Sequence, residues 1–215
     1  MNVNCVIFAA KYLVKEEIEN KRVIEIGACD INGSLKSFIE HYHPKEYLGA
    51  DIIPGPGVNI ICDVNNLISH FGEKSFDMVL ATELLEHVRD WKSAIHNIKN
   101  VCKTNAIVLI STRSYGFPYH DYPFDYWRYE LEDMKSIFSD FIIEKIEKDP
   151  GIGVFLKATK PDNFAEKDLA HYELYSIVTN RKTKELWDKD LKNLFFRTQI
   201  LKTKLKKYLL KLINA

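Results

Sequence analysis

The sequence has few cysteines and no paired cysteine motif. Its 215 residues contain four, Cys5, Cys29, Cys62 and Cys102, which lie far apart and form no C-x-x-C pair. This spacing argues against a structural zinc site and against a disulfide framework. We therefore expect reduced thiols and a cytoplasmic location.

Long apolar runs are also missing. No stretch approaches the roughly 20 apolar residues that a membrane-spanning helix needs, and the N-terminus lacks a basic region followed by an apolar run. We expect neither a transmembrane segment nor a signal peptide. Apolar residues still make up 46% of the chain, which is enough for a sizeable core.

A net charge is absent too, since 30 basic residues balance 30 acidic ones, so no global field attracts nucleic acid or anionic membranes. The balance is uneven along the chain, because residues 181–215 carry eleven Lys or Arg against three Asp or Glu. Apolar residues recur there at spacings of three and four, which predicts an amphipathic helix. The repeat consists of Leu191, Leu194, Thr198, Leu201, Leu205, Tyr208 and Leu212. This helix either packs on the domain or on a sister subunit, or offers a basic face to RNA or an anionic membrane.

Short apolar runs alternate with amphipathic stretches before this tail. Helices are predicted at 33–43, 91–103 and 131–141, and strands at 22–28, 46–52, 58–62, 76–82, 106–112, 142–149 and 153–160. The first five of these strands are apolar throughout, which is typical of a parallel sheet with helices on both faces. A short turn joins the last two strands as a hairpin, which predicts an antiparallel edge.

The predicted fold class is therefore α/β: a Rossmann-like, doubly wound, seven-stranded and mostly parallel sheet with an antiparallel last strand. This domain takes residues 1–160, and residues 161–215 form a helical, basic and amphipathic C-terminal extension. In an open parallel sheet, ligands bind beyond the carboxyl ends of the strands. The residues that follow each strand are thus the candidates for binding.

The segment EIGACDINGS covers the end of the first strand and the loop after it, and contains Glu25, Gly27 and Gly33. Glycine allows tight turns and close approach of the backbone to a ligand. The dinucleotide fingerprint G-x-G-x-x-G is absent, because Cys29 takes the place of the second glycine, and this disfavours a nicotinamide-dependent oxidoreductase. After the next strand, the Asp51 carboxylate can accept hydrogen bonds from both hydroxyls of a ribose.

The string ATELLEHV follows the fourth strand and contains Glu83, Glu86 and His87, which would share one face of an α-helix. Three interpretations stay open. The glutamates charge the first turn of a helix beside a packed histidine, or His87 takes a proton from an acceptor hydroxyl, or the three side chains bind a divalent cation. Residues 115–129 are rich in aromatic residues, which indicates either a substrate pocket or a compact lid.

In order and spacing, five segments resemble the motifs of class I S-adenosylmethionine-dependent methyltransferases, of the type 11-like group: VIEIGACDINGS, YLGADI, IICDV, FDMVLATELLEHV and AIVLISTR. The resemblance implies S-adenosylmethionine as cofactor, with its ribose on Asp51, its adenine on Asp63 and Val64, and Thr82 beside the path to the methyl group. The implied cofactor-binding set is Glu25, Gly27, Ala28, Gly33, Asp51, Ile52, Asp63, Val64 and Thr82.

Two groups of methyltransferases share the E-x-x-E-H string, namely the ubiquinone-pathway O-methyltransferases and the 2′-O-methyltransferases of small-RNA 3′ ends. In the RNA group a later histidine completes a metal shell, and His120 resembles it here. The resemblance implies a divalent cation such as Mg²⁺ on Glu83, Glu86, His87 and His120, although metal-free relatives carry the same string. The candidate catalytic residues are His87, His120 and Glu86.

The predicted function is methylation of a hydroxyl on a small molecule, a sugar or a lipid. The E-x-x-E-H string favours it, as does the absence of the N/D-P-P-[YF] string of amino-methylating DNA enzymes. One alternative is an RNA ribose 2′-O-methyltransferase that uses the basic tail, and another is a non-catalytic, cofactor-binding partner subunit. The expected partner is a small-molecule or glycan acceptor, and residues 181–215 are candidates for a homo-oligomer contact or a peripheral membrane contact.

Overall fold

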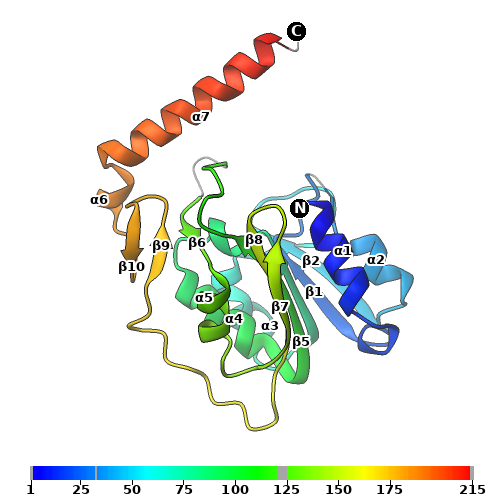
Figure 1. Cartoon of the computed structure of the whole chain (residues 1–215). Coiled ribbons are helices and arrows are strands. Elements are labelled where there is room, and N and C mark those ends of the chain that lie inside the picture. The colour runs from blue at the N-terminus through cyan, green and yellow to red at the C-terminus, as the bar shows by residue number, and fades with distance from the viewer. Residues whose placement is uncertain (1, 32, 121–124, 214–215) are drawn as a thin grey trace.

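A seven-stranded sheet forms the centre of the protein, in the order β3-β2-β1-β4-β5-β8-β7 (Figure 1). The computed structural model describes residues 2–31, 33–120 and 125–213, with side chains as far as residue 205. The strands of this sheet are β1 (Arg22–Ile26), β2 (Glu46–Asp51), β3 (Ile60–Ile61), β4 (Phe76–Thr82), β5 (Cys102–Arg113), β7 (Ile142–Asp149) and β8 (Gly153–Thr159).

The first five strands in this order, from β3 to β5, pair in parallel. Strand β8 runs antiparallel to both of its neighbours, β5 and β7. The predicted seven-stranded, mostly parallel sheet with an antiparallel last strand is confirmed. The antiparallel strand does not form the edge, however. The hairpin folds β8 back between β7 and β5, so that β7 becomes the edge strand.

Helices cover both faces of this sheet, as its buried central strands β4 and β5 require. One face carries α1 (Val3–Tyr12) and α2 (Lys36–His41), and the other carries α3 (Leu67–Phe71), α4 (Trp91–Val101) and α5 (Leu131–Ile137) (Figure 1). In β4, Met78 and Leu80 belong to the core under α1, whereas Val79 and Ala81 belong to the core under α4. The helix predicted at 33–43 begins three residues later, so Gly33 lies in the loop before it.

Residues 161–187 are not helical, which corrects the prediction of a wholly helical extension. There, β9 (Leu174–Ser176) pairs with β6 (Trp127–Arg128) and with β10 (Arg181–Thr183), and the three strands form a second sheet. Leu174 and Val178 are buried in the same core as Trp127, and this burial explains why the segment packs on the domain.

The helical part of the extension consists of α6 (Asp188–Leu191) and α7 (Leu194–Ile213), and α7 leads away from both sheets (Figure 1). None of the described helices is both long and apolar enough to cross a membrane. The part of the predicted aromatic segment at 121–124 lies outside the described residues, as do the side chains of Tyr208 and Leu212.

Candidate active site

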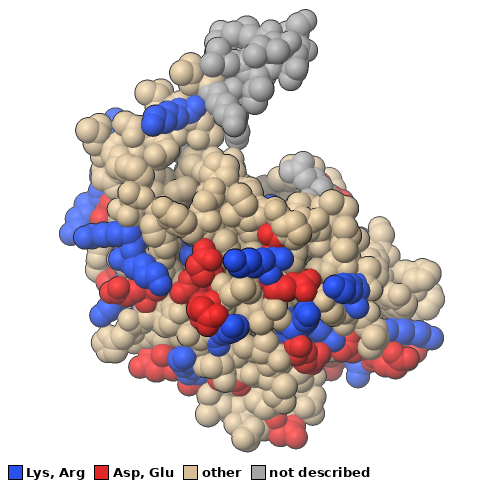
Figure 2. Space-filling model, in the orientation of Figure 1, with Lys and Arg blue, Asp and Glu red and all other residues tan. Residues whose placement is uncertain are grey.

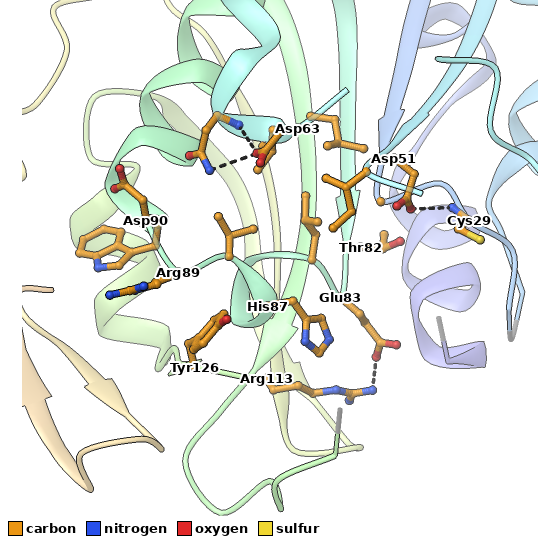
Figure 3. Close-up of a pocket in the computed structure, with 18 of the residues that line it drawn as sticks. Cys29, Asp51, Asp63, Thr82, Glu83, His87, Arg89, Asp90, Arg113 and Tyr126 are labelled. Atoms are coloured by element: carbon orange, nitrogen blue, oxygen red, sulfur yellow. Dashed lines mark hydrogen bonds and ion pairs between the residues drawn. The ribbon is translucent and has the colours of Figure 1, made fainter. Parts of the chain in front are cut away.

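A cavity of about 1290 Å³ opens at the carboxyl ends of β1, β2, β4 and β5 (Figure 3). The loops after these strands meet there, as expected for an open parallel sheet. All of the residues predicted to bind the cofactor line this one cavity: Glu25, Gly27, Ala28, Gly33, Asp51, Ile52, Asp63, Val64 and Thr82. These residues therefore lie together in one cavity, and their contacts with the cofactor stay predictions.

The loop after β1 is held by its neighbours in a conformation that needs glycine. Gly27 has a φ of 76°, which L side chains rarely adopt, and an added Cβ would lie 3.1 Å from Leu84 Cδ1. The N–H groups of Gly27 and Ala28 both donate to the Ala50 carbonyl. Glu25 is buried below the loop, and burial raises its pKa although Tyr47 and Ser34 donate hydrogen bonds to its carboxylate.

Two carboxylates are fixed along the cavity wall (Figure 3). Asp51 accepts hydrogen bonds from the N–H groups of Cys29, at 3.0 Å, and Ile53, at 3.2 Å, which lock the orientation of its carboxylate. Asp63 accepts one from the Asn65 N–H at 2.9 Å, as the N-cap of a short 3-10 helix that starts at Val64. Each carboxylate keeps further lone pairs for a ligand.

The E-x-x-E-H string does not form the expected α-helical face. Glu83 has a left-handed backbone with a φ of 54°, and the 3-10 helix Leu85–His87 follows it. Glu83 instead forms an ion pair with Arg113 and accepts a hydrogen bond from Asn2 at 2.7 Å (Figure 3). Because a bend and a short 3-10 helix follow β4 in place of an α-helix, Glu83 is separated from the other two residues of the string.

Glu86, His87 and His120 are brought together, although 33 residues separate the two histidines in the sequence. Their candidate ligand atoms all lie within 4.8 Å of one another. Glu86 is fully buried, and its Oε2 accepts a hydrogen bond from the Thr112 hydroxyl at 2.9 Å. Among the described residues, Glu86 Oε1 has no hydrogen-bond partner, and it lies 3.9 Å from His87 Nε2.

His120 is oriented by a buried ion pair that the sequence prediction missed. The Asp125 carboxylate lies 2.9 Å from His120 Nδ1 and also pairs with Arg128, whose Nη2 donates to it at 2.9 Å. Burial acts to raise the pKa of Asp125, but hydrogen bonds from His120 and Arg128 lower it to about 2. Asp125 is therefore ionised at neutral pH. The sequence feature that could have indicated this pairing is the position of Asp125, five residues after His120.

The C-terminal extension supplies the remaining wall of the cavity, which the sequence prediction also missed. Leu186 and Trp187 line the cavity together with Arg89 and Tyr126. The Arg89 guanidinium donates to the Leu186 carbonyl at 2.8 Å and pairs with Asp188 at 2.7 Å. No local pattern connects these segments, because they are about a hundred residues apart in the chain.

A family model described as a methyltransferase domain matches residues 8–148 of the chain. The match spans well over half of the 215 residues. The chain therefore belongs to this methyltransferase family. The carboxyl-edge cavity is the place where a sheet of this topology binds its ligand, so the family and the geometry agree.

Solved structures of methyltransferases share the fold. An S-adenosylmethionine-dependent methyltransferase from Mesorhizobium loti has a TM-score of 0.55 and 16% identity, covering 71% of this chain and 96% of that one. The Burkholderia thailandensis 1,6-didemethyltoxoflavin-N1-methyltransferase, solved with S-adenosylhomocysteine, has a TM-score of 0.55 and 17% identity, covering 75% and 78%. The Haemonchus contortus phosphoethanolamine N-methyltransferase 2, solved with S-adenosylmethionine, has a TM-score of 0.58 and 17% identity, covering 75% and 53%.

No curated protein matches the chain in sequence. The predicted class is confirmed by the family match and the shared fold: the protein is an S-adenosylmethionine-dependent methyltransferase, with that molecule as its cofactor.

Proposed function

We propose that the protein transfers the methyl group of S-adenosylmethionine to a hydroxyl of a small-molecule, sugar or lipid acceptor, with histidine side chains receiving the hydroxyl proton. The observation that carries this proposal is the cluster of Glu86, His87 and His120, two of which line the cavity beside the strand-end residues. A hydroxyl must lose a proton as it is methylated, and a positioned imidazole is well suited to accept it.

In this proposal the strand-end residues hold the cofactor in one orientation. Asp51 accepts hydrogen bonds from the ribose hydroxyls, and Asp63 and Val64 contact the adenine. Gly27, Ala28 and Gly33 would lie under the methionine part, and Thr82 beside the methyl group. Two backbone N–H groups hold the Asp51 carboxylate in one orientation, which supports this arrangement. A side chain that is already fixed loses little entropy when a ligand binds.

S-adenosylmethionine supplies an electrophilic methyl group when bound. With this donor bound, the acceptor oxygen would take the methyl group, the sulfide would leave, and a histidine nitrogen would accept the acceptor proton. His120 is the better positioned base, because Asp125 beside its Nδ1 directs the opposite nitrogen, Nε2, toward accepting a proton. His87 lies next to it, with ring centroids 4.8 Å apart.

A divalent cation is the second chemistry that this cluster fits. Glu86 Oε1 is a buried carboxylate oxygen without a hydrogen-bond partner among the described residues, which is the kind of atom that a cation satisfies. Glu86, His87 and His120 would hold the ion, and Glu83 would not, because it pairs with Arg113. The ion would supply positive charge that stabilises the deprotonated acceptor oxygen.

We place the acceptor beside the wall of the cavity that contains Tyr126, Arg89 and Trp187, and call this wall the acceptor end. Its aromatic and cationic character suits a polar, ring-containing acceptor. Tyr126 and Trp187 supply ring faces, and Arg89 and Lys184 supply positive charge. Aromatic faces pack well against the apolar faces of sugar rings, and few polar groups are needed to set orientation. An RNA ribose is the second candidate acceptor, favoured by the eleven basic residues of 181–215.

Alanine substitution of each cluster histidine tests the proposal. The purified enzyme is incubated with S-adenosylmethionine and a panel of hydroxylated sugars, lipids and RNA ends, and S-adenosylhomocysteine release is measured. His120→Ala is expected to lower turnover by about 10²- to 10⁴-fold while cofactor affinity stays unchanged. His96→Ala is the matched control, because His96 is an exposed histidine on α4.

Chelation separates the two chemistries. Loss of turnover in EDTA, with recovery on adding Mg²⁺, supports the cation, and unchanged turnover removes it. If both histidine variants keep full turnover, the acid–base proposal is wrong. Cofactor binding without turnover on every acceptor class would instead indicate the non-catalytic partner subunit.

A further inference from the structure

The first half of α7 carries an apolar stripe that faces away from the rest of the protein. Leu194, Leu201 and Leu205 are 78%, 67% and 57% exposed, and their spacing of seven and four residues places them on one side of the helix. Phe196 and Ile200 lie on the opposite side, where they pack against the core of the domain. The contact with the domain therefore leaves the leucine stripe uncovered.

The charges around this stripe have one sign. Arg197, Lys202 and Lys204 are exposed and flank the leucines, and no acidic residue occurs in the sequence after Asp190. Lys and Arg side chains also gather on the side of the molecule where β10 lies, just before α6, while both signs alternate over the body of the domain (Figure 2). An apolar stripe between cations is the pattern of a helix that lies in a membrane interface.

We propose that α7 binds the surface of an anionic lipid bilayer, lying in the plane of the interface with Leu194, Leu201 and Leu205 toward the acyl chains. The long stems of Lys202 and Lys204 would reach the anionic headgroups from either side of the stripe. This inference rests on α7 alone and does not depend on the chemistry proposed for the cavity.

Other occupants fit the stripe less well. Pairing of α7 with a second copy would bring lysines against lysines, since the helix offers no acidic partner. RNA binding would use the cations and would leave the three leucines exposed to water. The domain itself already uses the opposite side of the helix, through Phe196 and Ile200.

The cavity lies close to the start of this helix. Trp187 lines the cavity seven residues before Leu194, and the Phe196 ring packs against Tyr119, with ring centroids 5.5 Å apart. Tyr119 is the neighbour of His120 in the chain. A bilayer bound to α7 would therefore lie near the acceptor end of the cavity, which suits the lipid acceptor among the proposed hydroxyl acceptors.

Vesicle flotation with the full-length protein tests the inference. We expect binding to vesicles that contain phosphatidylglycerol, weak binding to phosphatidylcholine alone, and weakening of binding as salt is added. The double variant Leu201→Ser/Leu205→Ser should bind at least about tenfold more weakly. The matched control is Ile7→Ser/Ile142→Ser, since these two side chains are each 58% exposed and belong to α1 and β7 of the sheet domain (Figure 1).

The stripe variant must keep its unfolding midpoint and its affinity for S-adenosylhomocysteine, so that weaker flotation reflects lost membrane contact and not misfolding. Lys202→Ser/Lys204→Ser should weaken binding to anionic vesicles and leave the residual binding to phosphatidylcholine unchanged. Three results would overturn the proposal: no flotation of the wild type, equal flotation of the stripe variant and the control, or a dimer in light scattering that the stripe variant abolishes. Binding to a short RNA without vesicle binding would also overturn it.

Discussion

Asp125 connects the chemistry of the site to the stability of the fold. Its carboxylate is buried between a cavity histidine, His120, and a buried guanidinium, Arg128. A buried charge is tolerated only when it is paired and hydrogen-bonded. The same pairing orients the imidazole, so that one buried residue serves both the packing of the aromatic segment and the proposed proton transfer.

Substitution of Asp125 should reveal this dual role through pH. Its pKa falls from 3.8 to about 2 on folding, so its ionised form stabilises the folded state above about pH 4, and this stability is lost as pH falls through 2. The shift corresponds to about 2 kcal/mol at neutral pH. Asp125→Asn is expected to lower the free energy of unfolding in urea by at least this amount, with the difference from wild type shrinking toward acid pH.

Glu173→Gln, at an exposed carboxylate, is the control and should leave the unfolding curve unchanged at every pH. A constant difference between Asp125→Asn and the wild type across the acid range would contradict the assigned ionisation.

At the residue scale, the strand-end rule explains which site residues the sequence could predict. Asp51 and Thr82 are the last residues of β2 and β4, and Asp63 lies just after β3. The carboxyl ends of parallel strands converge whatever the details of packing. Glu83 could not be placed in this way, because its left-handed backbone and its ion pair with Arg113 depend on a strand that comes later in the chain.

At the scale of elements, β2 and the loops beside the cavity are packed too closely for any side chain at Gly49. An added Cβ there would lie 1.9 Å from the carbonyl oxygen of Gly57 and 3.0 Å from Ala28 Cβ. The N–H of Gly49 also donates to Asn59 at 2.8 Å, so the strand cannot shift without breaking that bond. Gly49 therefore allows the loop that contains Gly57 and the loop that contains Ala28 to pack closely against β2.

Gly49→Ala should therefore destabilise the fold by about 1–3 kcal/mol, the usual cost of overpacking, and weaken S-adenosylhomocysteine binding because Ala28 lines the cavity. Gly72→Ala is the comparison: its φ of 80° and ψ of 164° favour glycine, but an added Cβ would meet only Ser75 Oγ at 3.8 Å. It should lower stability by about 1–3 kcal/mol through backbone strain, with no change in affinity. Thermal unfolding and calorimetry measure both quantities, and an equal loss of affinity in the two variants would contradict the packing argument.

The parallel strands β1 to β5 could be predicted because they lie in short, mainly apolar runs between turn residues, whereas β7 also carries charged residues and was predicted from its place in a hairpin. The place of β8 inside the sheet could not, since a hairpin specifies that two strands are neighbours and not which of them reaches β5. The strands β9 and β10 have three residues each, and their partner β6 has two. Such short strands depend on burial of Leu174 and Trp127 in the common core and leave little periodic pattern.

For the whole molecule, the extension and the sheet domain share one hydrophobic core. Phe196 of α7, Leu186 and Val178 are buried with Trp91 and Tyr119 of the domain. The extension thus contributes both a wall of the cavity and part of the core, and we expect the two parts to unfold in a single cooperative transition.

Two adjacent phenylalanines test this shared core. Phe196→Ala should lower the free energy of unfolding by about 3–5 kcal/mol, since it empties a buried site. Phe195→Ala removes the same atoms from a half-exposed position on the same helix, and a loss of about 1 kcal/mol or less is expected. Urea unfolding followed by tryptophan fluorescence and circular dichroism measures both. Separate transitions, or equal losses at the two positions, would show that α7 does not belong to the core.

The central claim is that the carboxyl-edge cavity holds S-adenosylmethionine with its ribose on Asp51. Isothermal titration of the full-length protein with S-adenosylhomocysteine tests it most directly, comparing wild type with Asp51→Ala. We predict one site per chain in the wild type and an affinity at least about tenfold lower in the variant, because charge-assisted hydrogen bonds to the ribose are lost. No heat with folded wild-type protein, or equal affinities in the two proteins, would contradict the account.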